Sequence, residues 1–228
     1  ISSASNDGWA LMAGVAKSHC RAITSLVIAM LLYTGSANAS DEQAKTENLA
    51  FKEAVQAVKD KNYSLAIDLF EEQAKIPRHD AQYNLAVLLK AGKGQPRNYV
   101  DALFWSWQAQ LGSIDDAEDL ATDIADLLPQ KVADEVRSRV GDTLQSRIEA
   151  NDILAIPQFA NFHLTILAEP DYGNAYVWYS IATALNLPDT IDARDDAESQ
   201  LESEDIVALQ TKATELFKKY DFKPLPSG

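Results

Sequence analysis

The feature that most constrains the fold of this chain is a repeated Tyr-x-x-Ala motif. The motif begins at Tyr63, recurs at Tyr99 and recurs again at Tyr172. The step from Tyr99 to Tyr172, which we call the long shift, is close to twice the step from Tyr63 to Tyr99. A period in the mid-thirties is typical of helix pairs that stack into a solenoid, because each pair buries its apolar face against its neighbours.

Other residues follow the same shifts and have the spacing of helices. Trp105 matches Trp178 across the long shift. Apolar residues elsewhere recur every three or four positions, as on one face of a helix, and the longest such stripe comprises Val132, Val136, Val140, Leu144 and Ile148. No stretch alternates apolar and polar residues with a sustained period of two. We therefore predict an all-α fold, an α-solenoid of stacked antiparallel helix pairs.

The segment from residue 81 to residue 117 carries small residues and one tryptophan at a recognisable spacing: Ala81, Leu85, Gly92, Gly94, Ala102, Trp105, Ala109, Gly112 and Ala117. The later copy keeps Ala175, Trp178 and Ala182. This pattern resembles the Sel-like repeat, a subclass of the tetratricopeptide repeat with a glycine-bearing loop between its helices. In such a repeat the alanines let the paired helices approach, the tryptophan fills the gap between them, and the glycines suit positive φ at turns.

The resemblance is specific over residues 81–117, moderate over 160–217 and weaker over 50–80, while residues 118–158 depart most from the pattern. The family is similar to other helical-repeat scaffolds, whose concave surfaces hold peptides or partner domains and which share no common catalytic residue. The resemblance therefore implies a protein–protein interaction scaffold or adaptor, without catalysis and without a cofactor. It does not identify the partner.

The N-terminus has the parts of a Sec-type signal peptide. Lys17 and Arg21 form a basic region, residues 22–32 form an apolar run, and a cleavage site of small residues ends at Ala39. The apolar run is shorter than the ~20 residues that a membrane-spanning helix needs, although a retained signal anchor is the alternative. Cleavage after Ala39 predicts a periplasmic or secreted protein with no membrane span after processing.

These boundaries define the expected organisation of the chain. Met12 is a plausible start of translation, so that residues 1–11 would lie upstream of it. The expected parts are the upstream residues and signal over 1–39, a flexible segment over 40–48, a helical-repeat domain over 49–220 with halves of about 49–150 and 151–220, and a tail over 221–228.

Charge and cysteine content exclude several classes of function. The chain has 34 acidic and 20 basic residues, and loss of residues 1–39 would change its net charge from -14 to -15. Such acidity argues against binding to nucleic acid or to an anionic membrane surface, because both attract basic patches. Cys20 would leave with the signal peptide, so we expect no disulfide and no cysteine-ligated metal in the processed protein.

No motif in the sequence assigns catalysis or a metal site. After processing, His79 and His163 are the remaining histidines, which are too few for a zinc site without cysteine. The acidic runs at 115–119 and 192–198 lack the alternating oxygens and central glycine of a calcium loop. Two alternatives remain open: an envelope or cell-wall hydrolase that uses Asp and Glu alone, and an acidic inhibitor that covers the basic rim of an envelope enzyme.

The aromatic residues are the best candidates for partner binding. Trp105 and Trp178 occupy the packing position of the repeat, whereas Trp107 and Tyr179 fall elsewhere on their helices and are either exposed or buried between units. Exposed aromatic side chains in a groove make good anchors for a partner. We predict a monomer that binds another envelope or secreted protein, with Trp107, Tyr179 and Arg97 as candidate contacts.

Overall fold

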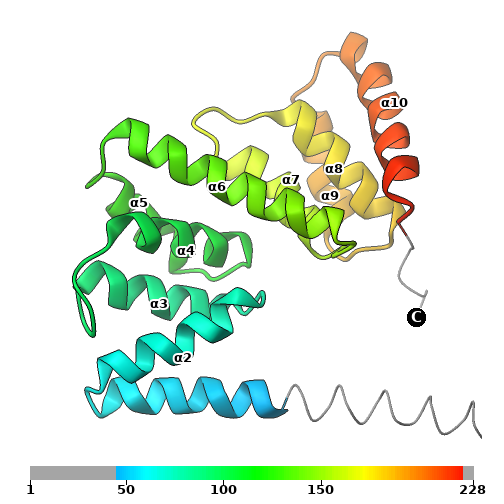
Figure 1. The fold of residues 1–228 in the computed structure, drawn as a ribbon. Coiled ribbons are helices and arrows are strands. Elements are labelled where there is room, and N and C mark those ends of the chain that lie inside the picture. Colours follow the sequence, from blue (N-terminus) through cyan, green and yellow to red (C-terminus); the bar gives the residue numbers. More distant parts are fainter. Residues whose placement is uncertain (1–44, 223–228) are drawn as a thin grey trace, which may run out of the picture. The chain divides into compact units, whose positions relative to one another are not determined.

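The computed structural model describes residues 45–222 of the chain (Figure 1). The chain divides into two compact units, residues 1–52 and 53–228, and each is considered by itself. In the first unit the described residues, 45–52, are helical, and in the second unit residues 53–59 are helical. Residues 45–48, which belong to the segment expected to be flexible, are helical. The expected signal peptide and residues 223–228 of the expected tail lie outside the described residues.

The described residues of the second unit form helices joined by short turns, in agreement with the predicted all-α fold. Their bounds are α2 Tyr63–Lys75, α3 His79–Ala91, α4 Tyr99–Leu111, α5 Ala117–Ala125, α6 Gln130–Glu149, α7 Ala155–Thr165, α8 Tyr172–Ala184, α9 Thr190–Glu198 and α10 Ser203–Tyr220. No β-strand occurs between residues 45 and 222. None of the helices described over this range combines the length and apolarity that crossing a bilayer requires.

Helices α4 and α8 are the centres of packing in the second unit. Helix α3 packs on α4 as an antiparallel pair, and α5 and α6 also pack on α4 (Figure 1). The same arrangement recurs around α8, on which α7, α9 and α10 pack. Helix α6 contacts α7 as well, so the stacking continues through the segment 118–158 that departs from the repeat pattern.

The long shift is visible in the positions of the helices. Helices α4, α5 and α6 begin at positions 99, 117 and 130, and α8, α9 and α10 begin at the equivalent positions 172, 190 and 203. Each central helix also has a side-chain cap, since Asn98 accepts a hydrogen bond from the backbone N–H of Asp101 at 3.1 Å and Asp171 accepts one from that of Asn174 at 2.9 Å.

Helices α4–α6 form a first set and helices α8–α10 an equivalent second set. In each set a cation from the last helix reaches the first turn of the first helix at the same place. Arg139 of α6 donates to the carboxylate of Asp101 at 2.6 Å, and Lys212 of α10 donates to the side-chain oxygen of Asn174 at 2.7 Å. Both members of the second pair are the counterparts of the first pair across the long shift. Helix α10 therefore lies on α8 in the register in which α6 lies on α4.

The three glycines of the repeat have two different structural roles. Gly92 and Gly94 have φ of 69° and 89°, as predicted for turn residues. Gly112 has φ of -92°, so the prediction of positive φ is wrong there, and Ser113 adopts the left-handed conformation instead. Gly112 is constrained by packing, because a Cβ atom on it would lie 1.8 Å from Cγ of the His79 ring.

Candidate functional site

Trp107 and Tyr179, two of the predicted partner contacts, lie in the interior. Their exposed fractions are 6% and 8%, so of the two alternatives left open by the sequence the structure shows burial. The Arg137 guanidinium lies 5.3 Å from the centre of the Trp107 ring, and burial raises the pKa of Tyr179. Neither ring faces solvent, so the alternative in which they are exposed anchors does not hold. Arg97, the third candidate, is exposed on the loop between α3 and α4.

Trp105 and Trp178, which the repeat predicts to be equivalent, differ in their surroundings. Trp178 is 7% exposed, with the rings of Phe159 and Tyr220 centred 5.2 Å and 6.3 Å from its own. Trp105 is only partly buried. In the first set of helices, Arg147 is the counterpart of Tyr220 across the long shift and supplies no ring to cover the tryptophan. Trp105 is therefore the tryptophan of the repeat that a ligand can reach.

The exposed part of Trp105 faces a pocket of about 320 Å³, which we call the Trp105 pocket. Helix α2 and its following turn, α3, α4, α6 and the turn after α6 each contribute to its wall. The lining residues are Ala74, Lys75, Ile76, Pro77, Gln82, Phe104, Trp105, Gln108, Thr143, Arg147, Ala150 and Asp152. The wall is mostly apolar, with a small number of polar groups, which is the usual composition of a ligand site.

Arg147 is the charged group held most firmly in the wall of the pocket. Its Nε donates to the carboxylate of Asp152 at 2.8 Å, and its Nη1 donates to the side-chain oxygen of Gln158 at 2.7 Å. Its Nη2 lies 2.8 Å from the same carboxylate, but it is buried and has no well-aligned hydrogen-bond acceptor among the described residues. These two hydrogen bonds therefore hold the guanidinium in a fixed position in the wall of the pocket.

A network of amides and one imidazole supports the pocket from behind. His79 accepts a hydrogen bond from the side-chain amide of Gln158 at 2.9 Å, and its other ring nitrogen lies 2.8 Å from the side-chain oxygen of Gln82. Gln82 in turn donates to the backbone carbonyl of Ala74 at 3.1 Å. The network ties α3 and α7 to the end of α2, so the pocket has a rigid rear wall.

We expect His79 to make the stability of the protein dependent on pH. Burial lowers the pKa of His79 from its ordinary 6.5, so the unfolded chain takes up a proton at higher pH than the folded chain does. The contribution of neutral His79 is therefore complete above pH 6.5 and is lost as the pH falls from there toward the lowered value. Denaturant unfolding of wild type and of His79→Gln between about pH 7.5 and about pH 5.5 should show wild type losing stability relative to the variant.

Wild type and His79→Gln have the same carboxylates. The effects of protonating those carboxylates, including the relief of repulsion in an acidic chain, therefore cancel in the difference between the two unfolding free energies. A difference in unfolding free energy that stays constant over the whole pH range would contradict the assignment of a neutral, buried His79.

The second histidine, His163, has one carboxylate beside it. Its Nδ1 lies 3.7 Å from Asp171, and burial lowers its pKa. Burial would raise the pKa of Asp171, but hydrogen bonds from Asn174 lower it overall, which is opposite to what a general acid needs. Over the described range, no three His, Cys, Asp or Glu side chains are grouped so that they could hold a metal ion.

No protein-family model matches the sequence, and no curated protein matches it significantly. A search of solved structures finds similarity to c5321, described as a protective antigen present in uropathogenic Escherichia coli strains and displaying an SLR fold. The two chains are 17% identical with a TM-score of 0.33, and the match covers 76% of this chain. It spans 46% of the length of that chain.

Proposed function

We propose that this chain is a helical-repeat adaptor that binds a segment of another protein in the Trp105 pocket. The observation that carries the proposal is the partly exposed Trp105 ring beside an immobilised Arg147, in a concavity formed by consecutive repeats. An aromatic face and a guanidinium together suit a peptide that brings an apolar side chain and a carboxylate or backbone carbonyl. Tryptophan and arginine are the residues most often responsible for binding energy at interfaces.

The charge at the rim of the pocket supports the same kind of partner. Lys75 lines the rim with an exposed side chain, and it lies 2.5 Å from Glu72 on the same helix. This exposed pair is weak, so Lys75 remains able to exchange Glu72 for an acidic residue of a partner. The proposal includes export to the periplasm or the medium, which rests on the signal-peptide pattern that ends at Ala39.

Crosslinking in cells that express the full chain, followed by affinity capture and mass spectrometry, tests the proposal. We expect a specific partner whose recovery falls about tenfold with Trp105→Ala and with Lys75→Glu, since each removes a group from the pocket. Lys131→Glu is the matched control. Lys131 is an exposed lysine of α6 that pairs with Glu135 on its own helix and does not line the pocket.

Melting temperatures of the variants separate a loss of binding from a loss of folding. Recovery of the same partner at wild-type yield with both pocket variants would exclude the Trp105 pocket. Recovery of no specific protein by folded wild type, with the crosslinker shown to be active, would count against an adaptor of any kind.

A further inference from the structure

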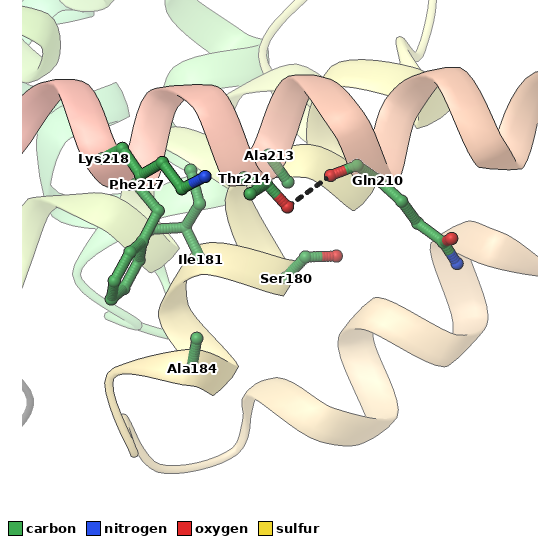
Figure 2. Close-up of a pocket in the computed structure, with 8 residues that line it drawn as sticks. All are labelled: Ser180, Ile181, Ala184, Gln210, Ala213, Thr214, Phe217 and Lys218. Carbon is green, nitrogen blue, oxygen red and sulfur yellow. Dashed lines mark hydrogen bonds between the residues drawn. The ribbon is translucent and has the colours of Figure 1, made fainter.

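Helices α8 and α10 border a groove of about 340 Å³, which we call the α8/α10 groove (Figure 2). Its lining residues are Ser180, Ile181, Ala184, Gln210, Ala213, Thr214, Phe217 and Lys218. Ile181 and Ala213 form a buried apolar floor, whereas Ala184, Thr214 and Lys218 are exposed along its edges. The hydroxyl oxygen of Ser180 is buried without a hydrogen-bond partner among the described residues.

The long shift places an equivalent groove between α4 and α6, and there the chain fills it with α7. The Phe162 ring of α7 comes to 3.1 Å from the position of a Cβ atom on Gly141 of α6. Arg137 of α6 donates to the backbone carbonyl of Ile166, at the end of α7, at 2.8 Å. Helix α7 also contacts α4. The groove between α4 and α6 therefore accommodates one helix.

The residues that hold α7 have counterparts that line the second groove, where Gln210 donates to the Tyr176 hydroxyl of α8 at 3.2 Å. Arg137 and Gly141 correspond to Gln210 and Thr214, and both of the latter are exposed. Leu144 is fully buried, while its counterpart Phe217 is only partly buried. Within the described residues of the second unit, α10 packs chiefly on α8, and no helix there takes the place that α7 takes on α6.

We propose that the α8/α10 groove binds an amphipathic helix of a partner protein, in the way that the groove between α4 and α6 binds α7. The proposal rests on the adaptor function and adds a second, separate contact surface to it. A helix from a second copy fits less well, because the candidate α7 is already packed, with Phe159 and Phe162 buried in its own chain.

Differences between the two grooves indicate the chemistry of the partner helix. Trp107 and Leu111 are replaced by Ser180 and Ala184, so the second groove is wider and needs a large apolar side chain, such as Phe or Trp, from the incoming helix. Lys218 at the edge favours an acidic residue on the outer face of the helix.

A peptide with the sequence of residues 155–168 is the probe, because it contains the helix that fills the equivalent groove. With a fluorescein label, its anisotropy should report saturable binding to the purified full chain. We expect Thr214→Arg and Ala184→Arg to weaken binding about tenfold, since each places a long charged side chain at an exposed edge of the groove. Replacement of Phe162 by Ala in the peptide should have a similar effect.

Thr211→Arg is the matched control for Thr214→Arg. Both threonines are exposed on α10 and donate to the carbonyl four residues earlier, at 2.9 Å for each, but Thr211 does not line the groove. Binding that is absent in wild type, or equally strong with Thr214→Arg and Ala184→Arg, would overturn the proposal. A dimer of the chain that Thr214→Arg dissociates would assign the groove to a second copy and would also overturn it.

Failure of this test is distinguishable from failure of the adaptor function itself. The Trp105 pocket is lined from α2, α3, α4, α6 and their turns, whereas the groove is lined from α8 and α10. Capture of a partner that depends on Lys75 and Trp105 would therefore persist if the groove bound nothing.

Discussion

Gly112→Ala is expected to lower the free energy of unfolding by about 3 kcal/mol, at the upper end of the cost of overpacking a core. The added Cβ atom would lie 1.8 Å from Cγ of His79, far inside van der Waals contact. The ring cannot yield freely, because Gln82 and Gln158 hold its two nitrogens at 2.8 Å and 2.9 Å. Relief of the clash therefore requires either a backbone shift at the end of α4 or disruption of this network. Denaturant unfolding followed by circular dichroism measures the loss.

Two comparisons isolate the cause of this loss. In a His79→Ala background, Gly112→Ala should cost much less, because the ring that it meets is absent. Gly173→Ala in the first turn of α8 should be neutral or stabilising by about 0.5 kcal/mol, since the nearest atoms to its added Cβ are 3.6 Å away and alanine favours a helix. Equal losses for Gly112→Ala with and without His79 would show that the contact does not cause the effect.

The same glycine shows where reasoning from the sequence succeeds and where it stops. Gly92 and Gly94 were predicted to have positive φ because they stand in the loop of a helix pair, and both have it. Gly112 stands at a helix end as well, but its role is decided by the ring of His79 at the start of α3. A contact of that kind leaves no periodic or local signal in the sequence.

The helices and their pairing were predictable because the repeat encodes them, whereas the candidate site was not. The sequence argument gave each helix one buried face, on which Trp105 occupied the packing position. Helix α4 instead packs against α3, α5 and α6, so it is buried on most sides. The partial exposure of Trp105 depends on Arg147, which belongs to a helix outside the matched repeat. The Trp105 pocket therefore follows from tertiary packing that the spacing of residues does not record.

Trp107→Ala is expected to destabilise the fold by about 3–5 kcal/mol, the range found when a large aromatic side chain is removed from a core. Trp107 is 6% exposed and lies under the Arg137 guanidinium, so truncation leaves a cavity and removes a cation–π contact. Arg137 also donates to the carbonyl of Ile166, and its displacement would loosen the end of α7. We therefore expect α7 to become the first part of this region to exchange its amide protons.

Trp105→Ala is the matched comparison, since it removes the same side chain from the same helix at a partly exposed position. It should cost less stability than Trp107→Ala while having the larger effect on partner capture at equal folded concentration. Denaturant unfolding and hydrogen exchange measure the first effect, and capture by crosslinking measures the second. The opposite result would be that Trp105→Ala is the more destabilising variant and that Trp107→Ala reduces capture by folded protein more. That result would indicate that Trp107, and not Trp105, contacts the partner. Comparison of the two variants therefore distinguishes the Trp107 contact predicted from the sequence from the Trp105 pocket found in the structure.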